Sequence, residues 1–170
     1  MGTSTVRLYS LAARQAKTYL AAAAFIGGNI ALPQLCHLIP DGGRILLPLY
    51  FFTLLSAYKY GWRVGLLTAL LSPVINAALF GMPATAALPA IIFKSVAAAL
   101  AASRAASHTG HITLWTMTAV VATYQAAGTL FEWAWTGSFA AAVQDLRMGL
   151  AGMAVQIVGV WAAIRYLFKN

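Results

Sequence analysis

The sequence predicts an all-α fold: a single polytopic membrane domain over residues 1–170, with six transmembrane helices and both termini in the cytoplasm. Its 170 residues are 61% hydrophobic and only 8% charged, whereas soluble domains carry about 25% charged residues. Apolar runs of the length that a bilayer requires follow one another with short connections. Basic residues gather around alternate connections, which is the pattern of a multi-pass protein with cytoplasmic ends.

The first three helices are expected at 17–37, 44–59 and 61–80. The first is an apolar run from Leu20, of about the length that crosses a bilayer. A signal peptide is the alternative for this segment, but Leu35 before Cys36 is not the small residue that lipoprotein cleavage requires. The second helix is short and begins close to Pro48.

The last three helices are expected at 84–104, 111–135 and 146–167. The fourth is apolar apart from Lys94, in the run IIFKSVAAAL. Tryptophans lie near the inner end of the fifth and sixth helices (Trp115 and Trp161) and near the outer end of the fifth (Trp133 and Trp135). Tryptophan is enriched at both membrane interfaces, so these positions support the assignment.

The 11 Lys and Arg residues fix the expected orientation. With six spans, eight fall on one side: Arg7, Arg14, Lys17, Lys59, Arg63, Arg104, Arg165 and Lys169. Only Arg44 and Arg147 fall on the other side, together with Asp41 and Asp145. Cytoplasmic loops carry the excess of Lys and Arg, so the first side is predicted to be cytoplasmic.

Composition and motifs exclude several functions. The net charge of +8 could suggest nucleic-acid binding, but the basic residues punctuate apolar runs rather than forming one polar face, so no nucleic-acid partner is expected. The sequence lacks the G-x-x-x-x-G-K-[ST] phosphate loop and H-E-x-x-H. No enzyme activity and no cofactor are expected, and the C-H-x3-D spacing of Cys36, His37 and Asp41 does not predict a metal site.

Polar residues within the apolar runs concentrate in the outer half of the membrane at about 1.5 Å of depth per residue. The candidate substrate-binding residues are Lys94, Asn29, Gln34, His37, Asn76, Gln125, Glu132 and Arg44. All six prolines also lie in the outer half or the outer loops. This distribution predicts a pocket that opens outward, with residues 37–44 as its lid. It argues against a through-pore, which would need polar groups in the inner half as well.

Several of these residues have structural alternatives. A lysine near mid-membrane costs free energy unless it is paired with an opposite charge or hydrated. Lys94 therefore either binds an anionic ligand or pairs with Glu132, which lies about 10 Å away in depth. Asn76 could instead satisfy backbone groups that Pro73 frees. Asn29 and Gln125 could bridge helices, and His37 could be interfacial.

The run LLPLYFFTLLSAYKYGWRVGLLTALLSPVINAALFGMPATAALPAI, with a G-x3-G hairpin at Gly61 and Gly65 and Pro-rich outer turns, resembles the central helices of vitamin-uptake S components. These are the substrate-binding membrane subunits of energy-coupling factor (ECF) transporters. The resemblance covers most of the chain from about residue 17.

The resemblance implies that the chain captures a small water-soluble vitamin or related micronutrient outside the bacterial cytoplasmic (inner) membrane. It also implies partners: a membrane T component and cytoplasmic ATPase subunits. Docking on the T component would use small residues of the first helix, Ala12, Ala16, Ala23 and Gly27. A solitary small-solute transporter or channel, and a membrane-embedded scaffold or enzyme, remain the alternatives.

Overall fold

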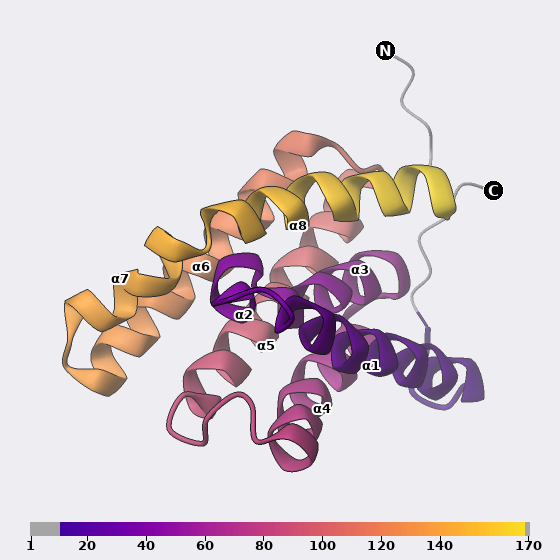
Figure 1. The fold of residues 1–170 in the computed structure, drawn as a ribbon. Coiled ribbons are helices and arrows are strands. Elements are labelled where there is room, and N and C mark those ends of the chain that lie inside the picture. The colour runs from indigo at the N-terminus through magenta and orange to yellow at the C-terminus, as the bar shows by residue number, and fades with distance from the viewer. Residues whose placement is uncertain (1–10, 169–170) are drawn as a thin grey trace.

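A computed structural model describes residues 11–168, together with all of their side chains except that of Asp145, and within this range the chain is helical and forms no strand. Figure 1 shows the arrangement. In chain order the elements are α1 (Ala16–Cys36), α2 (Gly42–Leu46), the 3-10 turn η1 (Pro48–Tyr50), α3 (Phe51–Tyr60), α4 (Trp62–Phe80), α5 (Leu88–Thr109), α6 (Leu114–Thr136), α7 (Phe139–Met148), α8 (Leu150–Ala162) and the π-helical turn η2 (Ala163–Leu167).

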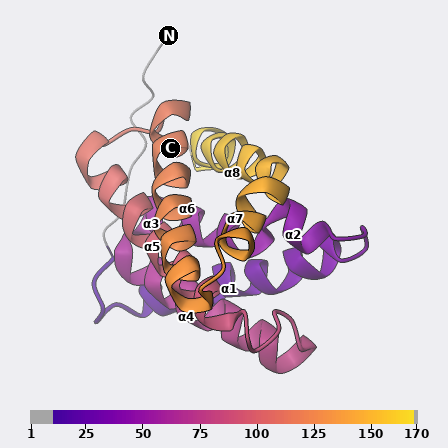
Figure 2. The same ribbon diagram turned by 90° about the vertical axis from the view of Figure 1, so that its left-hand side faces the viewer.

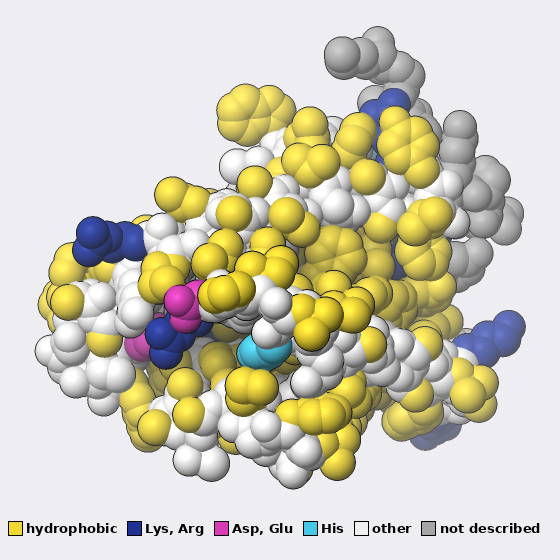
Figure 3. Space-filling view, viewed as in Figure 1, with side chains coloured by type: hydrophobic (Ala, Val, Ile, Leu, Met, Phe, Trp, Pro, Cys, Tyr) yellow, Lys and Arg dark blue, Asp and Glu magenta, His cyan; other side chains and the backbone are white. Residues whose placement is uncertain are grey.

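Four helical stretches of the described chain are long and apolar enough to cross a membrane: α1, α4, α5 and the run Leu150–Leu167 that joins α8 to η2. They coincide with four of the six expected spans. The expected fifth span corresponds to α6, which has 23 residues but dilutes its apolar side chains with threonines, Gln125 and Glu132. The hydrophobic side chains that cover much of the face in Figure 3 suit contact with lipid.

The expected second helix, 44–59, is broken. Leu47 lies in the left-handed region at φ 47°, between α2 and η1. Proline disfavours the right-handed α conformation in the residue before it, so Pro48 accounts for the break. The uninterrupted part, α3, has 10 residues, about 15 Å, and is too short to cross a bilayer by itself.

Other boundaries also move. The expected helix 84–104 begins later and continues to Thr109 in α5. The expected connection before residue 146 contains a separate helix, α7, which begins after Ser138, whose hydroxyl accepts from the Ala141 N–H at 3.3 Å. Gly149 separates α7 from α8.

The helix α5 packs against α3, α4 and α6, and α1 packs on α3 and α4 (Figures 1 and 2). The contact faces of α5 contain many alanines, including Ala98, Ala99 and Ala102, which are fully buried. Small residues let helix backbones approach closely. The G-x3-G hairpin works in the same way: Gly61 turns the chain at φ 88°, and a Cβ on Gly65 would lie 2.5 Å from that of Ala57.

Contacts at one end of the bundle bring both described chain ends together. The Leu11 N–H donates to the Tyr60 carbonyl at 3.3 Å, and Lys59 Nζ donates to the Phe168 carbonyl at 3.2 Å. The Tyr58 hydroxyl donates to the His111 carbonyl in the α5–α6 connection at 2.8 Å. These are the segments that the basic residues assigned to one side, although Arg7 and Lys169 lie outside the described residues.

Candidate functional site

Polar side chains form a connected cluster between α1, α3, α4 and α5. Asn29 of α1 is its centre: the amide nitrogen donates to the Thr53 hydroxyl at 3.1 Å and to the Ser72 hydroxyl at 3.2 Å. Thr53 in turn lies 3.4 Å from the Ser95 hydroxyl of α5. All four of these side chains are completely buried. We call this set, with Asn76 and Gln34, the amide cluster.

Asn76 joins the amide cluster through the backbone of α1. Its amide nitrogen donates to the Asn29 carbonyl at 2.9 Å and to the Ser72 carbonyl at 3.0 Å. Pro33 lies inside α1, four residues after Asn29. Since proline has no N–H, the Asn29 carbonyl loses its helical donor. The expected repair of Pro73 is therefore wrong: Asn76 compensates for the proline of a neighbouring helix.

Gln34 lies in the last turn of α1, His37 caps the C-terminus of that helix, and Arg44 lies in α2. The Gln34 amide nitrogen reaches Asn76 Oδ1 at 3.5 Å. The His37 ring nitrogen Nδ1 instead lies 3.0 Å from the Pro33 carbonyl, and its ring covers Gly43. Both His37 and Arg44 are exposed. The structure thus brings only Gln34 of these three into the amide cluster.

Lys94 and Glu132 form an ion pair between α5 and α6, with 2.7 Å between Nζ and Oε2. The sequence left open whether Lys94 meets a ligand or this acid, and the structure shows the pair. The lysine stem reaches the acid by running along α6 over Gly128, where a Cβ would overlap Lys94 Cγ. Lys94 is 1% exposed and Glu132 19%, so the outward end of the pair is the acid.

Gln125 lies one turn along α6 from Gly128, on the buried side of the helix. Its side chain is 2% exposed, and within the described part of the chain neither its amide oxygen nor its amide nitrogen has a hydrogen-bond partner. Asn29 Oδ1 is in the same condition. Buried polar atoms in folded proteins are almost always bonded, and an unmade bond costs about 1–3 kcal/mol. Gln125 and Asn29 thus keep unused hydrogen-bonding capacity in the interior.

The sequence did not predict that Tyr124, Gln156 and Leu47 bond to one another in the interior. The Tyr124 hydroxyl donates to Gln156 Oε1, and Gln156 Nε2 donates to the Leu47 carbonyl at 3.1 Å. The sequence indicated that Gln156 links helices, but not its partner. That partner exists only because the second helix breaks at Leu47.

The surface of Figure 3 is hollowed beside acidic and basic side chains that meet over the region of α2 and α6. Among the described residues, no three His, Cys, Asp or Glu side chains are grouped so as to hold a metal ion. Cys36 is a free, buried thiol. The interior thus offers amides, hydroxyls and one ion pair as its polar chemistry.

The four small residues assigned to partner docking, Ala12, Ala16, Ala23 and Gly27, are all exposed. No heavy atom lies within 4 Å of a Cβ built on Gly27. Gly28, the next residue, faces inward, where a Cβ would lie 2.9 Å from the Phe52 ring. The exposed face of α1 therefore carries Ala16, Ala23 and Gly27 beside the large exposed side chains of Tyr19, Leu20 and Leu35.

Comparisons of the chain with protein-family models, with curated proteins and with solved structures find no match.

Proposed function

We propose that this chain is the substrate-binding subunit of an ECF-type importer in the bacterial cytoplasmic membrane. It binds a small water-soluble vitamin or related micronutrient from outside and delivers it inward with a T component and ATPase subunits. The six-span topology with cytoplasmic termini is part of this proposal. Four of its spans are the long apolar helices, and the other two are α6 and the pair η1–α3.

The observation that carries the proposal is the unbonded, buried amide of Gln125. A primary amide offers one acceptor and two donors. A ligand with a matching amide, imide or ring N–H/C=O edge would bond both of its ends at once. Asn29 Oδ1 adds a further acceptor in the interior. Such a site would reject analogues that lack the edge, because the buried groups would then remain unpaired.

The Lys94–Glu132 pair changes the expected ligand. Lys94 already has a carboxylate at 2.7 Å, so an anionic ligand would have to displace Glu132. The pair carries no net charge, and a neutral polar ligand can bind beside it without separating two buried charges. We therefore propose a neutral ligand that carries an amide-like edge, in place of the anionic group that Lys94 suggested.

Partner docking is proposed on the outward face of α1. Ala23 and Gly27 are one turn apart and exposed, and small residues at this spacing allow close helix–helix contact in membranes. Co-purification with a T component and ATPases is the expected result. Full uptake activity from this chain alone would contradict the partner requirement.

The decisive experiment compares Gln125→Leu with wild type by native mass spectrometry and by thermal unfolding in detergent. The purified wild type should retain a small molecule. In the variant, affinity for that molecule should fall about 10- to 100-fold, because two hydrogen bonds are lost. The ligand-free variant should unfold at a higher temperature than the ligand-free wild type, because leucine removes a buried unbonded amide.

Gln144→Leu, on the exposed surface of α7, is the matched control and should change neither the bound ligand nor its affinity. If Gln125→Leu lowers the unfolding temperature of the ligand-free protein, Gln125 has a structural partner and the site is wrong. A wild-type protein that carries no ligand and binds nothing from a panel of vitamins would contradict the proposed function itself.

A further inference from the structure

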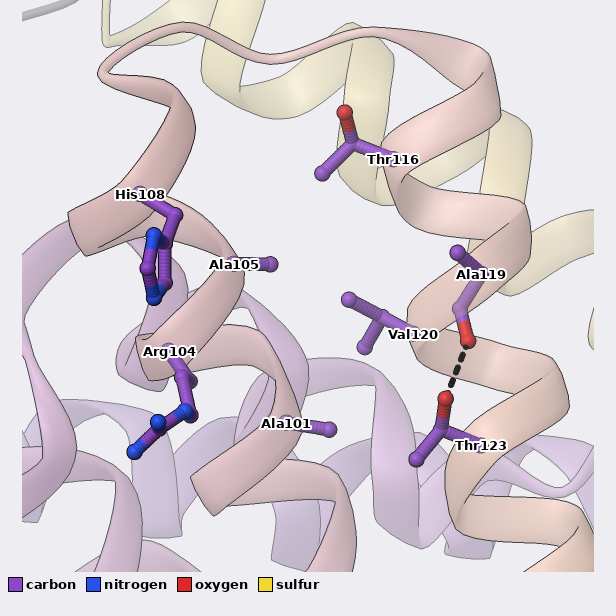
Figure 4. Close-up of a pocket in the computed structure, with 8 residues that line it drawn as sticks. All are labelled: Ala101, Arg104, Ala105, His108, Thr116, Ala119, Val120 and Thr123. Carbon is purple, nitrogen blue, oxygen red and sulfur yellow. Dashed lines mark hydrogen bonds between the residues drawn. The ribbon is translucent and has the colours of Figure 1, made fainter.

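A groove of about 300 Å³ runs along the surface between α5 and α6, toward the end of the bundle that holds their connection (Figure 4). Its lining, which runs from Ala101 to His108 on α5 and from Thr116 to Thr123 on α6, does not include the interior amides, and Gln125 lies on the buried side of α6. It takes no part in the proposed function. Its walls combine apolar and basic side chains, which favour different parts of an occupant.

The first kind is apolar. Ala101 and Ala105 on α5 point toward α6, from which Val120 points back (Figure 4). The two threonines of the wall use their hydroxyls inside α6: Thr123 donates to the Ala119 carbonyl at 2.7 Å, and Thr116 lies 2.8 Å from the Thr113 hydroxyl. What these walls present to an occupant is therefore mainly hydrocarbon.

The second kind is basic. Arg104 and His108 lie one turn apart on α5 and are both exposed, and Figure 4 shows them on the same side of that helix. Among the side chains that the structure describes, no carboxylate forms an ion pair with Arg104. A positive charge near the C-terminus of a helix is favourable in itself, but this accounts for the basic residues and not for the apolar groove beside them.

We propose that the groove binds an anionic phospholipid, with the phosphate against Arg104 and His108 and one acyl chain along Ala101, Ala105 and Val120. The occupant must carry a negative charge joined to a hydrocarbon chain, because the basic side chains and the apolar wall adjoin. The groove lies at the end of the bundle with the excess of Lys and Arg. In the topology proposed above, on which this step rests, that end faces the cytoplasmic leaflet, where anionic lipids attract basic residues.

The test is lipid retention by native mass spectrometry of the full chain, released from micelles with added phosphatidylglycerol, phosphatidylcholine or sodium phosphate. Phosphatidylglycerol should be retained in preference to phosphatidylcholine of equal chain length. Arg104→Gln should weaken its retention by about fivefold, the effect of one basic residue at an anionic surface. Ala119→Phe, at an exposed position of α6, keeps both basic residues but fills the groove and should also weaken retention.

Arg165→Gln is the matched control. Arg165 belongs to the same end of the bundle but stacks over Trp161 at 5.2 Å, outside the groove, so its loss should leave retention unchanged. An equal effect of Arg165→Gln would show unspecific charge attraction and overturn the proposal. Equal retention of the two lipids, or competition by phosphate alone as effective as by the lipid, would do the same. A cross-link from position 123 to a partner protein instead of to lipid would also overturn the proposal.

Discussion

At the scale of single residues, Gly128 decides where a charge lies. Lys94 runs across α6 at the place where Gly128 has no side chain, and this path takes its ammonium group to Glu132. A side chain at 128 would close the path. The ion pair therefore depends on Gly128, which lies on α6 four residues before Glu132 and packs against Lys94 of α5.

We expect Gly128→Ala to destabilise the protein by about 1–3 kcal/mol, because the new methyl group overlaps the Lys94 stem and overpacks a close contact. Gly27→Ala is the matched control: it lies in the same kind of apolar helix, in open space, and should stabilise by about 0.5–1 kcal/mol through helix propensity. Unfolding in detergent measures both. Effects of the same sign and size would contradict this account of Gly128.

Pro33 and Asn76 give a second lesson at this scale. The sequence paired Asn76 with Pro73 because they are three residues apart, whereas the structure pairs it with the carbonyl that Pro33 frees in α1. Proximity along one helix was the only criterion that the sequence offered. Which helix supplies the freed carbonyl depends on packing between helices.

At the scale of elements, the broken second helix is held by α8. Its break at Leu47 leaves a carbonyl in the interior, and Gln156 donates to it while accepting from Tyr124. Close approach of the elements makes this possible: a Cβ on Gly152 of α8 would lie 2.5 Å from the Leu46 carbonyl carbon. Gln156 of α8 thus joins α6 and the junction between α2 and η1.

We expect Gln156→Leu to destabilise the protein by about 2–4 kcal/mol, because it leaves both the Leu47 carbonyl and the Tyr124 hydroxyl without this partner. Thermal unfolding in detergent measures the loss. The double variant Gln156→Leu with Tyr124→Phe should recover part of it, since the hydroxyl is then gone. If Gln156→Leu is neutral, the break at Leu47 is held in another way.

At the scale of the whole molecule, the contacts of Leu11, Tyr60, His111 and Phe168 put the described chain ends and two connections at one end of the bundle. The opposite end holds His37 with α2, which packs on α7 and α8. The excess of Lys and Arg at the first end predicts that it faces the cytoplasm.

Single cysteines test this orientation in a Cys36→Ala background. A cysteine at Leu38, which is 81% exposed, should react with a membrane-impermeant maleimide in intact cells. A cysteine at His108, exposed near the other end, should react only after the cells are permeabilised. The reverse pattern would invert the topology, and with it the outward opening of the proposed site.

The sequence by itself determined the helical class, four of the six predicted spans and the gathering of both described chain ends at one end, because run length, composition and charge pattern are local properties. It also placed Asn29, Gln34 and Asn76 at similar depth, and these three meet. Only the tertiary structure decided the Lys94–Glu132 pair, the proline that Asn76 compensates, the break at Leu47 and the unbonded amide of Gln125. These depend on which helix faces meet and how closely, and a glycine such as Gly128 sets that approach without changing the hydrophobic pattern from which the helices were predicted.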